Sequence, residues 1–269
     1  MMRSLWTAAS GMKTQQATVD SIANNLSNVN TVGFKKERLE FKSLLYETMK
    51  NAGDIANGGS PVNLQVGHGV RTVASVKSFT QGTFERTEGP LDFAIEGDGF
   101  FTLMDVNGNP IFTRDGSFKT SILDGELMLT SSTGRPVLGI DGEPIVFDET
   151  VVANKLSVDE QGIFSTIVDG DRVDLGIQLQ VVQFQNPQGL KTIGGGFYEQ
   201  TVASGVPIIE VENEDMEGSM VVQGALEASN VQAVEEMVKL IVAQRAYELS
   251  SKAIQSSDEM LQRANELKR

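Results

Sequence analysis

The sequence predicts an α+β protein in which long N- and C-terminal α-helices pair as a coiled coil, with a central, mainly antiparallel β domain between them. Three observations support this fold class. Helix-breaking residues are confined to the middle, since 25 of 27 glycines and all seven prolines lie between Gly53 and Gly224. A seven-residue apolar repeat occurs at each end of the chain, and turn signals recur through the middle.

The N-terminal repeat predicts a helix over residues 3–28. Its apolar positions recur every seven residues at Leu5, Met12, Val19 and Leu26. Ile22 belongs to a companion stripe three residues later, which Gln15 interrupts. The asparagines that follow, Asn24, Asn25 and Asn28, are residues that enter left-handed conformations and end helices. So narrow an apolar stripe suits a coiled-coil partner better than a broad sheet face.

The C-terminal repeat predicts one helix over residues 230–267. Its seven-residue positions are Leu240, Tyr247, Ile254 and Leu261. Ser229 and Asn230 are the expected N-cap, and two glutamates follow at the positive end of the helix dipole. Together with Leu5, Met12, Val19, Ile22 and Leu26, these four positions are the predicted helical seam between subunits.

The middle of the chain predicts β-structure. Seven Asn-Gly or Asp-Gly pairs punctuate it, and such pairs supply the positive φ angles of tight hairpin turns. Strands are expected at Phe100–Met104, Glu126–Leu129, Pro144–Phe147 and Ile177–Phe184. This pattern favours a barrel or sandwich over βαβ units. The stretch Asn51–Ser60 is expected to be an exposed loop or insertion.

The composition of the chain excludes several classes of binding and catalytic site. The net charge of −14 argues against nucleic-acid binding, because no basic field can displace counterions from phosphates. The absence of cysteine excludes thiolate catalysis and sulfur-ligated metals, and His68 is the single histidine. We therefore expect no catalytic residue, no metal site and no cofactor, although a glycosidase-like pair among the 36 acidic residues stays open. We also expect no membrane insertion and no cleaved signal peptide.

Three segments, Ile22–Phe41, Leu91–Phe101 and Gln223–Leu261, resemble the signatures of one family, the bacterial flagellar axial proteins of the rod and hook. Ile22–Phe41 is similar to its N-terminal signature, and there the matching motif residues are Asn24, Asn25, Asn28, Gly33 and Phe34. Leu91–Phe101 is similar to the start of the β domain in rod and hook proteins, with Gly97, Gly99 and Phe100 in the motif. Gln223–Leu261 resembles the C-terminal helix signature.

The resemblance implies a structural subunit that polymerises helically into the hollow flagellar rod, transmits torque from motor to hook and lines part of the export channel. It implies a coiled-coil core domain at 1–33 and 230–269, and an extended connecting region at 34–89 and 201–229. A rod-type insertion is implied near 46–66, and an outer β domain at 90–200. Length and the stretch Leu44–Arg71 resemble the distal rod subunit most. A proximal rod subunit, or a secreted carbohydrate-active or carbohydrate-binding β domain, are the alternatives.

The same resemblance implies the partners and the location. The subunit is expected to form a homo-oligomer and to contact other rod proteins, the hook protein and the bushing ring proteins around the rod. It is also expected to pass the flagellar export apparatus without a cleaved signal peptide, and to reside in the periplasmic rod of the basal body.

Overall fold

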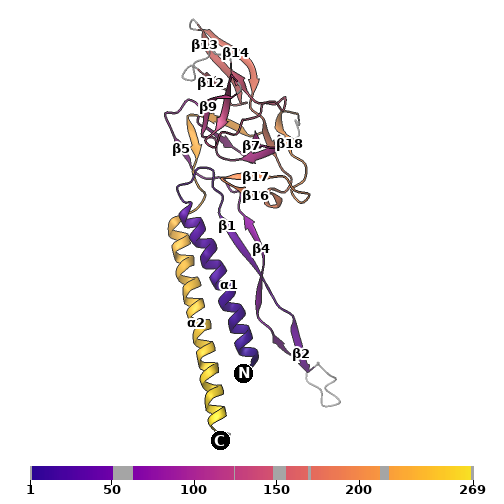
Figure 1. Cartoon of the computed structure of the whole chain (residues 1–269), viewed down its shortest axis with the longest axis vertical. Helices are drawn as coiled ribbons and strands as arrows, with labels where there is room; N and C mark the ends of the chain where they lie inside the picture. Colours follow the sequence, from indigo (N-terminus) through magenta and orange to yellow (C-terminus); the bar gives the residue numbers. More distant parts are fainter. Residues whose placement is uncertain are drawn as a thin grey trace. The chain divides into compact units, whose positions relative to one another are not determined.

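The structure is a computed structural model that describes residues 2–50, 63–123, 125–147, 156–168, 171–212 and 218–267. The chain divides into two compact units (Figure 1). Unit 1 consists of Met1–Ser27, Glu37–Lys77 and Gln232–Arg269, and unit 2 consists of Asn28–Lys36 and Ser78–Val231. Both units are therefore assembled from segments that are far apart in the sequence.

Unit 1 contains the two long helices and two short β-ribbons. Its elements are α1 (Met2–Ser27), β1 (Glu37–Ser43), β2 (Tyr46–Lys50), β3 (Leu64–Gly67), β4 (Val70–Lys77) and α2 (Ala233–Glu266). α1 and α2 lie side by side and run in opposite directions (Figure 1). β1 pairs with β4 and β2 pairs with β3, both antiparallel. The predicted loop at Asn51–Ser60 lies outside the described residues, between β2 and β3.

Both terminal helices are confirmed, with ends that differ by one to three residues from the prediction. The expected N-cap of α2 is wrong, because Gln232 occupies that position and makes no side-chain cap. Asn230 instead uses its side chain to bind the backbone of other segments of unit 2. Glu235 and Glu236 do lie in the first turn, where the helix dipole favours acidic side chains.

Unit 2 is built from small antiparallel sheets, as the turn pattern predicts. Its strands are β5 (Phe84–Arg86), β6 (Phe93–Glu96), β7 (Phe100–Met104), β8 (Pro110–Thr113), β9 (Phe118–Leu123), β10 (Glu126–Ser131), β11 (Val146–Phe147), β12 (Leu156–Val158), β13 (Ile163–Val168), β14 (Asp171–Gln178), β15 (Val181–Gln183), β16 (Lys191–Gly194), β17 (Phe197–Glu199), β18 (Ile208–Ile209), β19 (Met220–Gln223) and β20 (Ala225–Glu227). Within the described residues of unit 2, single-turn 3₁₀ helices lie at η3 (Pro187–Gly189) and η4 (Glu210–Glu212).

The largest sheet of unit 2 has the strand order β16-β17-β8-β7-β15-β18. Three-stranded sheets form in the orders β11-β10-β9 and β12-β13-β14, and β19 pairs with β6 and β20 with β5. β7 separates two apolar clusters, because successive side chains of a strand point to opposite faces. Phe101 lies in the larger cluster and Phe100 in the smaller aromatic one.

Two features of unit 2 differ from the sequence prediction. The apolar run Ile177–Phe184 spans the end of β14 and all of β15, which belong to different sheets. Gly108 and Gly142 have the positive φ expected of Asn-Gly and Asp-Gly turns, but Gly99 and Gly116 do not. A Cβ at Gly116 would collide with the carbonyl oxygen of Phe93, so this glycine allows close packing instead of a tight turn.

Candidate functional site

The facing surfaces of α1 and α2 consist of small and polar residues. Ser4 Oγ and Ser257 Oγ lie 3.3 Å apart, and a Cβ at Gly11 would lie 3.3 Å from Ser250 Oγ. A third contact joins the C-terminal end of α1 to the N-terminal end of α2, where Asn25 Nδ2 donates to Glu236 Oε2 at 3.3 Å. The contacting positions are 4, 11 and 25 on α1 and 257, 250 and 236 on α2, so they are separated by seven or fourteen residues on each helix. Because the two helices are antiparallel, the numbers rise along α1 while they fall along α2, and each helix keeps the same side toward the other.

The predicted seam residues of α1 flank this contact. Leu5, Met12, Val19 and Leu26 each follow a facing position by one residue, and one residue turns a helix by about 100°. All four are half-buried in the unit, whereas Ile22 is buried. On α2, Leu240, Ile254 and Leu261 are half-buried and Tyr247 is 42% exposed. Their role between subunits is a prediction.

Sequence reasoning missed a second apolar surface on α2. Val234, Val238, Ile241 and Val242 are each more than half exposed, although all are large and aliphatic. Val234 and Ile241 are seven residues apart, but Glu248 occupies the next position of that repeat, so a search for a sustained heptad passes over them. Their spacing of four, seven and eight residues from Val234 is nevertheless that of one helix face.

The motif asparagines hold the end of α1. Asn25 is buried, and its amide donates to the carbonyl of Glu37 while its Oδ1 accepts from the amide nitrogen of Glu37, both at 2.9 Å. It thereby fixes the first residue of β1 to the helix. Asn28 accepts from Thr31 Oγ1 at 3.1 Å, in the turn after the helix, whereas Asn24 is exposed on α1.

Unit 2 contains a buried ionic cluster, formed by Lys35, Arg114 and Glu227. Lys35 Nζ donates to Glu227 Oε1 at 2.7 Å, and Arg114 Nη1 donates to Glu227 Oε2 at 3.5 Å. All three side chains are about 1% exposed. Lys35 also donates to the carbonyl of Thr80 at 2.9 Å, and the amide of Gly82 donates to Glu227 Oε1 at 2.7 Å.

Burial is the main cause of the pKa shifts in and beside the ionic cluster. It lowers the pKa of Lys35, and the neighbouring Arg114 lowers this pKa further, while Glu227 acts in the opposite direction. Burial likewise lowers the pKa of Arg114 and raises the pKa of Tyr198. Because one carboxylate serves two cations, losing Glu227 would leave two buried positive charges without their anion.

The ionic cluster lies where several segments of unit 2 meet. Gly33 has φ +65° and donates its amide to the carbonyl of Glu227 at 2.8 Å. A Cβ at Gly33 would lie 2.7 Å from the backbone of Arg114, so the motif requires glycine here. The carbonyl of Phe34 accepts from the amide of Asn230 at 3.3 Å. The N-terminal motif is therefore a junction that ties residues 33–36 to residues 227–230.

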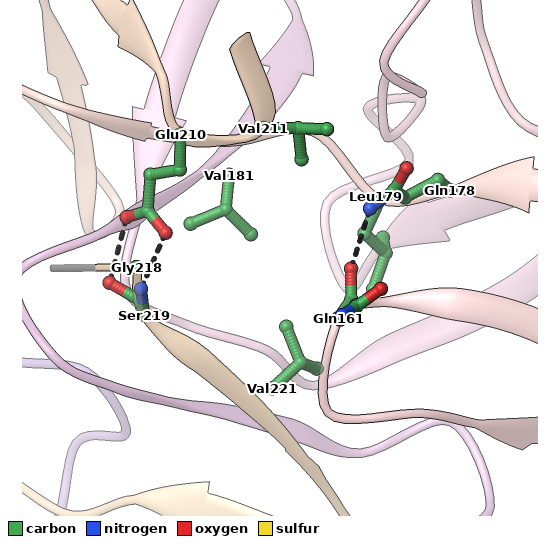
Figure 2. Close-up of a pocket in the computed structure, with 9 residues that line it drawn as sticks. All are labelled: Gln161, Gln178, Leu179, Val181, Glu210, Val211, Gly218, Ser219 and Val221. Atoms are coloured by element: carbon green, nitrogen blue, oxygen red, sulfur yellow. Dashed lines mark hydrogen bonds between the residues drawn. The ribbon is translucent and has the colours of Figure 1, made fainter. Parts of the chain in front are cut away.

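The second motif borders a pocket of about 280 Å³ in unit 2 (Figure 2). Its wall carries the Glu210 carboxylate, which accepts from the amide of Ser219 at 2.6 Å and from its hydroxyl at 2.7 Å. Gly97 and Gly99 make this arrangement possible. A Cβ at either one would lie within 2.8 Å of Ser219 Oγ, and at Gly99 it would also collide with Val181.

Phe100, the last residue of that motif, is completely buried in the aromatic cluster beside Phe79, Phe184 and Tyr198. The guanidinium of Arg114 stacks over its ring at 5.0 Å. Phe100 thus joins the aromatic cluster to the ionic cluster through a cation–π contact.

The described lining of the unit 2 pocket offers no pair of carboxylates for acid–base chemistry. Glu210 is the one acidic residue among the described residues that line the pocket, and both of its oxygens are bound by Ser219. No group of three or more potential metal ligands lies together within the described ranges. His68 lies 3.7 Å from Glu47 in unit 1. Neither described helix is long and apolar enough to cross a membrane.

Three family models match the chain. The model described as "Flagella basal body rod protein" matches residues 5–35, the "Flagellar hook protein FlgE/F/G D1 domain" matches residues 94–166, and the "Flagellar basal body rod FlgEFG protein C-terminal" matches residues 222–267. They overlap the three segments on which the sequence resemblance depends.

Whole-length relatives give the same family. The chain is 47% identical to the flagellar basal-body rod protein FlgG of Borreliella burgdorferi, with 100% of both chains covered. It is 38% identical to the FlgG of Buchnera aphidicola subsp. Schizaphis graminum, over 99% of this chain and 100% of that one. It is 35% identical to the FlgG of Bacillus subtilis, with full coverage of both. The chain therefore belongs to the FlgG family of flagellar basal-body rod proteins.

Proposed function

We propose that this protein is a structural subunit of the distal flagellar rod, which polymerises helically into a hollow drive shaft. The polymer would transmit torque from motor to hook and form part of the export channel. The observation that carries the proposal is the full-length match to rod proteins named FlgG. This is a family of structural proteins, and the protein is not an enzyme.

The helices are the proposed core of the polymer. We infer that residues 1–33 and 230–269 form a discontinuous coiled-coil domain, that 34–89 and 201–229 connect it outward, and that 90–200 form the outer domain. The antiparallel contact of α1 with α2 supports the first part, as does the flanking position of Leu5, Met12, Val19 and Leu26. The rod-type insertion near 46–66 would begin and end in the β2–β3 ribbon.

The protein belongs to the rod of the flagellar basal body and assembles with other flagellar components. The finer partners are proposals. They are further copies of this chain, the other rod proteins, the hook protein, the bushing ring proteins and the export apparatus. The periplasmic location, and export without a cleaved signal peptide, are likewise proposed from the family.

Electron microscopy of the concentrated, purified protein tests the assembly. Filaments or tubes are expected, together with restored swimming when the gene is returned to a deletion strain whose basal bodies stop before the distal rod. Particles that stay monomeric at high concentration, together with turnover of peptidoglycan fragments, would contradict the proposal and favour the carbohydrate-active alternative. A deletion strain whose basal bodies stop earlier would favour the proximal rod subunit.

A further inference from the structure

The last strands of unit 2 complete its core. β19 pairs with β6 and β20 pairs with β5, so these two strands join the first two strands of the unit. Residues 219–227, which contain β19 and β20, are here called the closing segment. Val221 of this segment is 3% exposed and lies in the larger apolar cluster with Phe93, Phe101 and Leu129, which come from β6, β7 and β10. The closing segment is therefore part of the core and not a peripheral addition.

Gln223 of the closing segment joins two parts of unit 2 that are far apart in the sequence. Its side-chain amide donates to the carbonyl of Pro90 at 2.7 Å and to the carbonyl of Leu156 at 2.9 Å. Its Oε1 accepts from the amide of Val158 at 3.0 Å. Pro90 lies in the turn before β6, whereas Leu156 and Val158 belong to β12. One side chain of the closing segment thus ties the β12-β13-β14 sheet to the start of β6.

Glu227, the last residue of the closing segment, supplies the carboxylate of the ionic cluster. Its partners Lys35 and Arg114 precede it in the sequence by 192 and 113 residues. Burial and the positive charge of Arg114 both lower the pKa of Lys35. Without Glu227, burying these two cations together costs desolvation and mutual repulsion, and no Glu227 carboxylate offsets either. Charge therefore opposes a unit 2 that forms before the closing segment is in place.

We propose that the closing segment sets the time at which unit 2 folds, so that strands β5 to β18 have no stable fold during synthesis until residues 219–227 leave the ribosome. β18 ends at Ile209, so all of these strands are made before the closing segment. Domains generally fold as units, so a missing core segment affects every strand. The delay lengthens the time during which a factor that binds unfolded chains can capture the protein. The inference concerns a single copy and is independent of the proposed rod function.

Ribosome-bound chains test the timing, because synthesis is the stage at which the closing segment is missing. Translation is stalled at arrest sites before and after the point where residues 219–227 leave the ribosomal tunnel, and the nascent chains receive a brief pulse of protease. We expect no protected fragment of unit 2 at the earlier sites, and a fragment containing residues 78–231 at the later sites. A protected fragment at the earlier sites that ends before residue 219 would overturn the proposal.

The purified full-length chain tests the same dependence at equilibrium, through Gln223→Leu. This variant keeps a side chain of similar size and removes the three hydrogen bonds of Gln223. The matched control is Gln178→Leu, which removes one exposed hydrogen bond to the carbonyl of Gln161. Hydrogen-exchange protection should fall by a similar factor, several-fold or more, in β7, β13 and β19 of the Gln223 variant, and stay near wild type in the control. A loss confined to β12 and β19 would overturn the proposal, because the earlier strands would then fold without the closing segment.

Discussion

Lys35 donates a 2.7 Å hydrogen bond to Glu227 across 192 residues of sequence, and both side chains are about 1% exposed. Their burial makes the pair expensive to break. Lys35→Met should destabilise unit 2 by about 3–5 kcal/mol, because Glu227 keeps a buried charge with a poorer set of partners. Chemical denaturation followed by near-ultraviolet circular dichroism measures the loss.

The matched control for Lys35 is Lys191→Met. Lys191 also lies 2.7 Å from a carboxylate, Glu199, but these side chains are 65% and 48% exposed. An exposed pair contributes about 1 kcal/mol or less. Equal losses in the two variants would show that burial does not set the strength of the Lys35 pair.

Gly33 should tolerate no side chain. Gly33→Ala places a Cβ at φ +65° and 2.7 Å from the backbone of Arg114, so both strain and a clash oppose it. Gly108→Ala is the control, since φ is +80° there but nothing lies within 4 Å of the added atom. The left-handed conformation alone costs roughly 1–2 kcal/mol. Thermal unfolding should show that amount at Gly108 and clearly more at Gly33, and similar losses at both would refute the clash.

Ile254→Asp should block polymerisation. If the predicted seam of α2 is covered by neighbouring copies, the change buries an unpaired carboxylate at each repeat of the polymer. Sedimentation and swimming assays measure the defect, and the β-rich unit should keep its unfolding transition. Ser256→Asp, at an exposed position two residues away, should assemble normally. Wild-type swimming by the Ile254 variant would contradict the seam assignment.

Deletion of Ala52–Ser60 should leave the β-rich unit 2 folded. These nine residues lie outside the described residues, and the strands on either side, β2 and β3, pair with each other from Lys50 to Leu64. Because the flanking strands already bring the ends together, a shorter connection can close the ribbon. Calorimetry should show a retained cooperative transition, while rod stiffness or length control is lost. Loss of the transition would mean that the segment belongs to a core.

The free monomer should be ordered mainly in its middle. Three contacts between α1 and α2 involve serine, glycine, asparagine and glutamate, which bury little apolar surface, whereas a fully buried large aliphatic side chain contributes ~1.5–3 kcal/mol. Ordering each helix residue costs ~1–2 kcal/mol of backbone entropy. Hydrogen exchange should therefore be fast at about 1–33 and 230–269 and slow within 90–200. Strong protection of both ends in dilute monomer would contradict this.

The sequence was informative where one signal dominated. Heptad spacing and missing helix breakers predicted both long helices, and the run Phe100–Met104 matches β7 residue for residue. The sequence was misleading where tertiary contacts determine the end of a strand or the cap of a helix. The run Ile177–Phe184 contains no breaker, yet the chain changes sheet within it. Asn230 has the side chain of an N-cap, but the backbone of Ser78 and Thr80 binds it instead.

The residues of the candidate site also divide into those that the sequence could predict and those that it could not. The motif residues Asn25 and Gly33 could be found from family resemblance, but their hydrogen-bond partners are 12 to 211 positions away in the sequence. The serine and glycine positions that join α1 to α2 could not be found, because hydrophobic periodicity gives no weight to small polar residues. The ionic cluster could not be predicted either, because the sequence around a single charged residue does not indicate whether its side chain is buried.

The junction between residues 33–36 and 227–230 has a consequence for how such proteins diversify. Asn230 accepts from the amide of Lys36 and donates to the carbonyl of Ser78, so the points where the chain enters and leaves unit 2 are held together. An insert whose entry and exit adjoin can be lengthened, shortened or exchanged without moving its neighbours. Unit 2 is thus a cassette, which recombination could replace while leaving unchanged the parts of the gene that encode α1 and α2.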